Sequence, residues 1–252
     1  MTLNKSPGNK SPGNKSTGPT LLAIDTAGSA CSVALGRGAA VLAAERQELR
    51  YGHAEALLPM IDRVMQAAAL PPAALDAVAV AVGPGGFTGI RVGLGAAHGI
   101  ALALQAELVG ITSFAAVVAA LPDKDGTRGA VLVALDSRRD DLYVQLFERA
   151  SAEPLAEPAA VLPEALLDYV ETVAAAPLLI AGDATDVAAA VLRGRFGIEV
   201  AAHSAPDAHG VLIAALHQLA RHPAGNPARP LYLRPPDVTL PKRRNPVAAA
   251  RR

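Results

Sequence analysis

The chain of 252 residues has a single cysteine, no tryptophan, 3% aromatic residues and no formal net charge. One cysteine, Cys31, excludes a disulfide framework and any zinc cluster held by several cysteines. The balanced charge excludes a strong overall basic field of the kind that attracts nucleic acid. Hydrophobic residues still make up 51% of the chain, so a packed core of small aliphatic side chains is expected.

The neutral total conceals two basic ends around an acidic body. The first twenty residues contain three lysines and no acid, and the last eleven contain five basic residues and no acid. Residues 4–16 read NKSPGNKSPGNKS, a repeat without apolar side chains, which predicts a disordered tail over 1–19 and a basic tail over 241–252. A direct tRNA-binding module that uses these ends is one alternative function.

Long apolar runs are also missing. The stretches at 77–90 and 92–106 are interrupted by a Gly-Pro-Gly-Gly sequence and separated by Arg91, so both fall short of the roughly 20 residues that span a bilayer. The amino-terminal repeat lacks the apolar region of a signal peptide. We therefore expect a cytoplasmic protein without membrane contact.

Two parts of the chain share one order of features. An apolar run at 21–24 ends at Asp25, and a polar turn then leads to a second apolar run at 31–35. Residues 135–146 align without a gap on 24–35, which places Asp136 opposite Asp25. Each acid is predicted to end the first strand of a β-hairpin. The repetition predicts an α/β chain made from a duplicated unit.

Two helices are predicted in the first copy. An apolar stripe over 53–69 has helical spacing, and Pro59 is tolerated only in a first turn, so this helix is expected to begin near Glu55. A strand at 78–82 leads through a glycine-rich loop to a second helix over 89–106, with Thr88 as its N-cap. That helix contains four glycines, each costing roughly 1 kcal/mol, so another helix or backbone segment is expected to approach it closely.

No residue pattern indicates catalysis or a structural metal. There is no His-Glu-x-x-His sequence and no G-x-S-x-G sequence, so no catalytic residue and no metal ligand is predicted. Backbone N–H groups at a helix start attract anions, which makes the glycine-rich loop a candidate nucleotide or anion site; a tight turn without a ligand is the alternative. The candidate residues are Asp25, Gly83, Gly85, Gly86, Thr88 and Gly89.

Several segments together resemble the TsaB family, also called YeaZ. They are LLAIDTAGSACSVAL (21–35), HAEALLPMI (53–61), AVGPGGFTGIRVGLGAAHGIALAL (81–104), VGITSF (109–114), DSRRDDLYVQLF (136–147) and PLYLRPPDV (230–238). The resemblance extends from about residue 20 to 240. Its most specific part is GPGGFTGIR, which has Gly86 where serine is commoner in the family, and this favours a structural loop.

The resemblance implies the ASKHA fold of actin, Hsp70 and sugar kinases, in which two ribonuclease-H-like lobes arise from a duplicated unit. It implies a first lobe over 20–108 and 206–240 and a second lobe over 109–205. The helix around 208–221 is expected to return to the first lobe. An active ASKHA phosphotransferase that uses Asp25 and the loop from Gly83 to Gly89 is a further alternative function.

The resemblance also implies a non-catalytic subunit. Such a subunit binds and activates a TsaD-type transferase that forms N6-threonylcarbamoyladenosine at position 37 of tRNAs reading ANN codons. The His-x-x-x-His metal pair of TsaD is absent here. The resemblance further implies that a TsaE-type ATPase joins the complex and that the chain can form a homodimer through the helices that bind the transferase. It also implies that contact with tRNA is weak or indirect. ATP or ADP is expected at the complex interface, without a cofactor bound tightly to this chain.

The partner interface is expected on the two helices of the first lobe, where a charge such as Ile61→Asp or Ala97→Asp should weaken binding. The predicted interface residues are Leu57, Leu58, Ile61, Val64, Met65, Ile90, Gly93, Leu94, Ala97 and Ile100.

Overall fold

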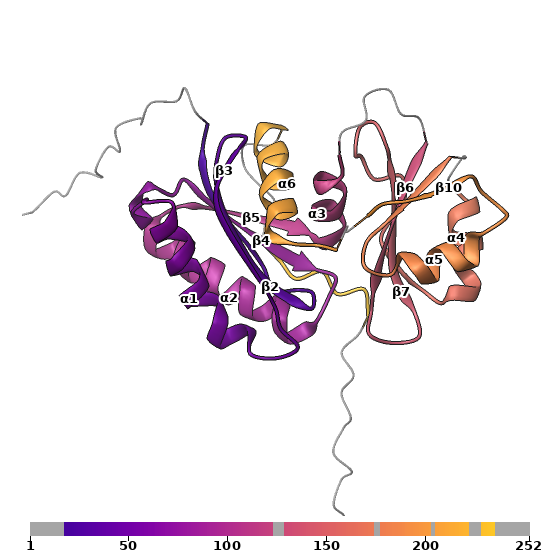
Figure 1. Cartoon of the computed structure of the whole chain (residues 1–252), viewed down its shortest axis with the longest axis horizontal. Helices are drawn as coiled ribbons and strands as arrows, with labels where there is room; N and C mark the ends of the chain where they lie inside the picture. The colour runs from indigo at the N-terminus through magenta and orange to yellow at the C-terminus, as the bar shows by residue number, and fades with distance from the viewer. Residues whose placement is uncertain (1–17, 123–128, 174–176, 203–204, 222–227, 235–252) are drawn as a thin grey trace, which may run out of the picture.

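The computed structural model describes residues 18–122, 129–173, 177–202, 205–221 and 228–234, which form two α/β lobes side by side (Figure 1). The predicted tails over 1–19 and 241–252 lie almost entirely outside these residues. The first lobe has a five-stranded sheet in the order β3-β2-β1-β4-β5. Its strands are β1 (Thr20–Asp25), β2 (Ala30–Arg37), β3 (Ala40–Glu48), β4 (Ala77–Gly83) and β5 (Glu107–Thr112).

The second lobe repeats this arrangement. Its sheet has the order β10-β9-β6-β7-β8, so each sheet places an antiparallel meander beside two parallel strands. The duplicated unit predicted from sequence is therefore confirmed. The strands are β6 (Ala130–Asp136), β7 (Leu142–Glu148), β8 (Ala159–Val161), β9 (Leu178–Ala181) and β10 (Ile198–Val200).

The two hairpins differ by one residue. Asp25 pairs with Ser32, whereas Asp136 pairs with Leu142, so the turn of the second hairpin is one residue shorter. The ungapped alignment of the two copies is therefore wrong along β7, because a shift of one residue moves a side chain to the other face of a sheet.

Helices cover both faces of the first sheet. On one face, α1 (His53–Ala67) packs on β2 and α2 (Phe87–Leu104) packs on β4, while α6 (Ala208–Arg221) lies across the other face (Figure 1). The expected return of a helix at 208–221 to the first lobe is confirmed. Short 3₁₀ helices, η2 (Pro72–Ala74) and η3 (Pro163–Ala165), complete the connections.

The helix α3 (Ser113–Ala120) is shared by the two lobes. Phe114, Val117 and Val118 pack against β6 and β7, and Ala116 packs with α6 in the core of the first lobe. The second sheet is covered on its other face by α4 (Leu166–Glu171) and α5 (Thr185–Leu192). The predicted limit at residue 108 falls inside β5, which hydrogen-bonds to β4 as far as Thr112, so the first sheet extends past it.

The amphipathic helix begins earlier than predicted. α1 starts at His53, so Pro59 lies in its second turn and not in its first. Pro59 and Glu55 are both exposed. The Glu55 carbonyl that Pro59 leaves without a helical donor can therefore be hydrated, which lowers the penalty of proline at this position.

The second helix also differs at its start. α2 begins at Phe87 after Gly86, and no side chain caps it, so the prediction of Thr88 as N-cap is wrong. It ends at Leu104 because Gln105 adopts a left-handed conformation, with φ of 51°, before β5 begins. Among the described helices only α2 is long and apolar enough to cross a membrane, and its inner face, with Ile90, Leu94 and Ala97, packs in the core of the first lobe.

The four glycines of α2 have two different environments. A Cβ atom at Gly89 would overlap the Thr26 carbonyl, and one at Gly93 would press on the Thr26 hydroxyl. The Thr26 Oγ1 donates to the Gly89 carbonyl over 2.7 Å. Gly95 and Gly99, by contrast, face open space. The predicted close approach of backbone is therefore confirmed for Gly89, whereas Gly93 makes room for side chains, and Gly95 and Gly99 have no described atom within 4 Å of where a Cβ would lie.

The segment 228–234 connects the lobes on the side of the α2 start. The Leu231 N–H donates to the Val82 carbonyl of β4 over 2.8 Å, and Leu233 packs in the cluster between α3 and the second sheet. Arg234 then forms an ion pair with Asp141, a buried residue of the second lobe. This segment fixes the second lobe against the first.

The two glycine environments predict opposite effects of alanine in one helix. Gly89→Ala should lower the free energy of unfolding by about 1–3 kcal/mol, because the added methyl group overlaps the Thr26 backbone. Gly95→Ala should raise it by about 1 kcal/mol, because alanine favours the helix and meets no atom. Urea unfolding of both variants measures this, and equal effects would contradict the packing.

Candidate functional site

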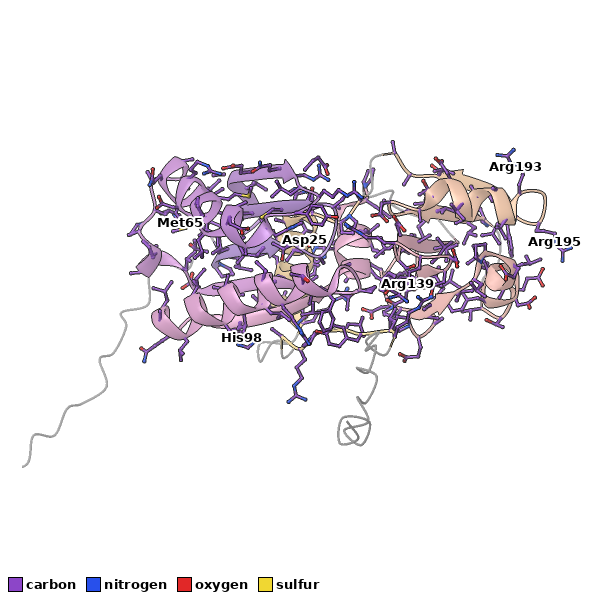
Figure 2. The ribbon with its side chains drawn as sticks, turned by 90° about the horizontal axis from the view of Figure 1, so that it is seen from below. Asp25, Met65, His98, Arg139, Arg193 and Arg195 are labelled. Atoms are coloured by element: carbon purple, nitrogen blue, oxygen red, sulfur yellow. The ribbon has the colours of Figure 1, made fainter. Side chains whose placement is uncertain are left out.

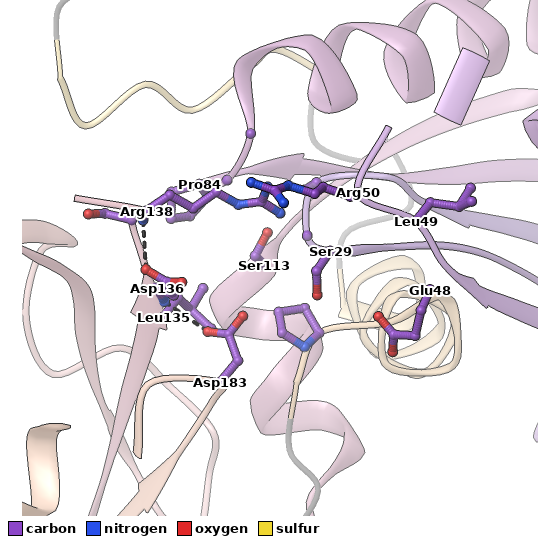
Figure 3. Close-up of a pocket in the computed structure, with 16 residues that line it drawn as sticks. Ser29, Glu48, Leu49, Arg50, Pro84, Ser113, Leu135, Asp136, Arg138 and Asp183 are labelled. Atoms are coloured by element: carbon purple, nitrogen blue, oxygen red, sulfur yellow. Dashed lines mark hydrogen bonds between the residues drawn. The ribbon is translucent and has the colours of Figure 1, made fainter. Parts of the chain in front are cut away.

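A cavity of about 490 Å³ lies between the two lobes (Figure 3). Both lobes contribute to it through the ends of their first strands, the turns that follow, and the start of α3. Its lining residues are Ala27, Gly28, Ser29, Glu48, Leu49, Arg50, Pro84, Gly85, Gly86, Ser113, Leu135, Asp136, Ser137, Arg138, Asp183 and Pro206.

The two equivalent aspartates play the same local role but differ in exposure. The Asp25 carboxylate accepts the Ala27 N–H over 2.8 Å, and the Asp136 carboxylate accepts the Arg138 N–H over 2.7 Å, so each shapes the turn after its strand. Asp136 lines the cavity, whereas Asp25 is 2% exposed and is not part of its lining; Figure 2 shows Asp25 within the first lobe. Burial raises the pKa of Asp25 to about 6. This position gives no support to Asp25 as the acid of a phosphotransferase.

The glycine-rich loop serves the fold more than the cavity. Gly86 donates its N–H to the Ala27 carbonyl over 2.7 Å, and a Cβ at Gly85 would overlap that same carbonyl. The glycines therefore allow this loop to pack directly on the turn after β1. This contact supports the alternative of a tight turn without a ligand.

The six residues of the predicted anion site are not brought together around one cavity. Gly85 and Gly86 line the cavity, whereas Thr88 is exposed outside it. Gly83, with φ of 100°, closes β4 against Ile90 and the Leu231 carbonyl, and Gly89 packs on Thr26. The structure therefore does not gather these six residues around one cavity, and binding of an anion or nucleotide by this loop stays a prediction.

The charged lining of the cavity comes from residues outside the predicted set. Arg50, Arg138 and Asp183 point into it, together with Asp136 and Ser113 (Figure 3). Asp183 accepts the Asp136 N–H over 2.8 Å, and partial desolvation raises the pKa of its carboxyl group. The internal repeat pointed to Asp136, but no sequence signal marked Ser113 or Arg50, because strand pairing and helix packing bring them here.

Metal-ligating and nucleophilic groups are sparse in the described part of the chain. No group of three or more His, Cys, Asp or Glu residues there could hold a metal ion. Cys31 is fully buried in β2, and burial raises the pKa of its thiol to about 11. The thiol is therefore protonated and poorly nucleophilic at neutral pH.

The predicted interface residues divide sharply by exposure. Leu58 is 58% exposed and Ile100 is half-buried, and both line a groove of about 440 Å³ between α1 and α2. The other eight point into the core of the first lobe: Leu57, Ile61, Val64, Met65, Ile90, Gly93, Leu94 and Ala97. Ile61 and Met65 also reach the floor of the groove.

This division by exposure determines what the substitutions Ile61→Asp and Ala97→Asp would test. Ala97 is fully buried and Ile61 is 9% exposed, so aspartate at either position would disrupt the core of the first lobe. The prediction that these two changes test partner binding is wrong. Sequence periodicity identified the apolar stripe of each helix, and that stripe packs on the lobe's own sheet.

The raised pKa of Asp25 predicts a pH-dependent stability. A folded pKa of about 6 against an ordinary value of 3.8 gives a contribution that is fully present below pH 3.8 and lost as pH rises through about 6. Relative to Asp25→Asn, which cannot ionise, the unmodified chain should lose up to about 3 kcal/mol between pH 4 and pH 7. Urea unfolding across this range measures the difference, and parallel pH curves would contradict it.

A family model described as "TsaD: tRNA N6-adenosine threonylcarbamoyltransferase" matches residues 47–228. The curated relatives include tRNA threonylcarbamoyladenosine biosynthesis protein TsaB of Escherichia coli, 33% identical over 129 residues that cover 51% of this chain and 55% of that protein. The TsaB of Haemophilus influenzae is 37% identical over 128 residues, which cover 49% of this chain and 52% of that protein. The chain thus spans about half the length of the curated relatives it matches.

Solved structures match over a longer range. A structure described as YeaZ from Pseudomonas aeruginosa has 30% identity and a TM-score of 0.71, and the match covers 85% of this chain and all of that one. Component A of (R)-2-hydroxyglutaryl-CoA dehydratase from Acidaminococcus fermentans shares the fold, with a TM-score of 0.51 and 11% identity over 79% of this chain and 97% of that chain. The predicted two-lobed ASKHA fold is confirmed. Since the YeaZ match extends over that whole structure and the family model covers most of this sequence, the chain belongs to the TsaB/YeaZ family.

Proposed function

We propose that this chain is a non-catalytic subunit in the synthesis of N6-threonylcarbamoyladenosine at position 37 of tRNAs reading ANN codons. In this role it binds and activates a TsaD-type transferase through the outer face of α1 and α2. Membership of the TsaB/YeaZ family supports a role in the synthesis of this modified nucleoside. The observation that supports binding to a partner is the exposed surface of α2, which is made of glycine and apolar residues.

The outer face of α2 combines features that its own fold does not use. Gly95, Gly99 and Leu102 recur at helical spacing on one face, and Leu102 is 83% exposed. Both glycines are exposed and meet no atom where a Cβ would lie. Glycine weakens a helix by roughly 1 kcal/mol relative to alanine, so a function outside the folded monomer accounts for this pair better than the fold does.

A partner helix fits this surface physically. Small residues allow helix backbones to approach, and a neighbouring apolar side chain then fills the adjacent groove. The groove between α1 and α2 lies next to the glycine face and is lined mainly by apolar atoms of Leu58, Met65 and Ile100, with Asp62 and Gln66 at its edge. An apolar centre with a polar edge is the usual composition of a protein–protein interface.

The same proposal includes the remaining members of the assembly. A TsaE-type ATPase joins the complex, and ATP or ADP binds at the shared interface and not tightly to this chain alone. A homodimer would use the same α1–α2 face and would therefore compete with the transferase. Contact with tRNA is weak or indirect, and the complex is cytoplasmic.

Substitutions on the outer face should separate binding from stability. Leu102→Glu and Gly99→Gln should each weaken binding of a TsaD-type partner at least about tenfold, because a charge or a larger side chain replaces a close apolar contact. Gly99→Gln should at the same time stabilise the free chain, since glutamine favours a helix and meets no atom there.

Isothermal titration calorimetry with the purified partner measures this binding. Val187→Glu is the matched control, because Val187 is a 45% exposed apolar residue on α5 of the other lobe. Unchanged affinity for both outer-face variants would exclude this interface.

The accessory role itself predicts a simple dependence in a reconstituted reaction. Modification of tRNA by the transferase and its partner proteins should fall to background when this chain is omitted, while the chain alone forms no product. Addition of the Leu102→Glu variant should restore less product than the unmodified chain at equal concentration. An undiminished yield of modified tRNA in the absence of the chain would contradict the proposed accessory role.

A further inference from the structure

Two aromatic rings lie together at the surface beside the start of α2. One belongs to Phe87, the first residue of α2, and the other to Tyr232 in the segment 228–234. Their centroids are 5.2 Å apart, and their planes are inclined by 32°. Each residue is 41% exposed, although the whole chain has only four phenylalanines and four tyrosines. Since a ring stabilises a core only where it is buried, this exposed pair indicates a surface for contacts outside the chain.

Arg91 completes the group, one helical turn after Phe87. Its Cζ lies 3.6 Å from the centroid of the Phe87 ring, and its Nε donates to the Tyr232 hydroxyl over 3.2 Å. These two contacts hold the exposed guanidinium group over the ring. Its Nη groups have no partner among the residues that the structure describes. The aromatic–arginine cluster of Phe87, Arg91 and Tyr232 therefore presents two rings and unused cationic donors to solvent.

The two segments that form this cluster carry charge of one sign. Neither α2 nor the segment 228–234 contains an aspartate or a glutamate, and together they contain Arg91, Arg229 and Arg234. Arg234 is paired with Asp141 of the second lobe. Arg91 and the exposed Arg229 form no ion pair with any described residue. The charge of these segments therefore suits an anionic partner.

This combination of groups fits single-stranded RNA. Unpaired bases stack on the rings of phenylalanine and tyrosine and on the guanidinium plane of arginine. The N–H groups at the edge of a guanidinium bind phosphate oxygens. A base-paired duplex fits less well, because its bases are stacked on one another and do not offer a free face.

We propose that the aromatic–arginine cluster stacks an unpaired base of a single-stranded RNA segment. The base lies on the rings of Phe87 and Tyr232, while Arg91 and Arg229 donate to the neighbouring phosphates. The identification of this RNA as the loop of the tRNA that is modified rests on the proposed function, whereas the stacking contact does not. The weak contact of the chain with tRNA is then a direct one.

The cluster is continuous with the face proposed for the transferase. Steps of four residues along α2 connect the two: Phe87, Arg91, Gly95 and Gly99. All four residues are exposed, so they follow one side of the helix. A transferase bound over the two glycines would therefore lie directly beside an RNA segment held at the cluster.

Binding of RNA to the purified full chain tests the stacking contact. Fluorescence anisotropy compares a labelled anticodon stem-loop, from a tRNA that reads ANN codons, with a blunt RNA duplex. The stem-loop should bind saturably and more tightly than the duplex. Phe87→Leu and Tyr232→Leu should each weaken its binding at least about fivefold, because an aliphatic side chain offers no ring for the base. Tyr232→Phe, which keeps the ring, should bind as the unmodified chain does.

The charge of the cluster is tested in the same assay. Arg91→Gln should weaken binding of the stem-loop and lower the slope of log affinity against log salt concentration by about one. Two variants outside the cluster should leave binding unchanged. Arg193→Gln removes a charge at the far end of the second lobe (Figure 2), and Tyr51→Leu removes a 79% exposed ring between β3 and α1. Any contact of the basic ends is common to all variants.

The outcomes separate this proposal from the proposed function. Gly99→Gln, which should weaken binding of the transferase, should leave binding of the stem-loop unchanged. Weaker binding of the transferase by the cluster variants, together with unchanged binding of RNA, would identify the cluster as a protein contact and overturn the proposal. Absence of saturable stem-loop binding, equal affinity for the duplex, or equal affinity of all variants would overturn it as well.

Discussion

The architecture of the first lobe depends on backbone packing between the turn after β1 and the start of α2. Gly86 donates to the Ala27 carbonyl, Thr26 donates to the Gly89 carbonyl, and no side chain fits between the two segments at Gly85 or Gly89. This contact sets where α2 begins and how closely it lies on β4. It thereby decides which side of α2 faces the sheet and which side is left for a partner.

The two lobes share a strand order but have divergent roles. In the first lobe, the turn after β1 packs directly against the loop after β4, and Asp25 is buried. In the second lobe, the equivalent Asp136 stays at the cavity and is joined there by Asp183. The helix α3 starts at the cavity and packs on both lobes, and the segment 228–234 links them on the α2 side. The cavity is thus a product of how the copies are joined.

Sequence reasoning recovered the fold because its signals are local and repeated. Alternating and continuous apolar runs gave the strands, and the repeated strand–Asp–turn pattern gave the duplication. Its errors arose where tertiary context overrides local preference. Pro59 is tolerated inside α1 because the affected turn faces solvent, and Thr88 does not cap α2 because Gly86 already occupies the cap position. The shorter turn of the second hairpin could not be inferred from the sequence, because a one-residue difference in a turn leaves the apolar pattern almost unchanged.

The sequence by itself determined the duplicated α/β architecture, the family, and the two helices of the first lobe, one amphipathic and one rich in glycine. Periodicity and motif identity carry that information because each is encoded by neighbouring residues. Only the tertiary structure decided which side of those helices is exposed, since Gly89 and Gly95 are the same residue in one helix and differ only in what lies opposite. It also brought Ser113, Arg50 and Arg138 to one cavity, because residues far apart in sequence meet only where sheets and helices pack.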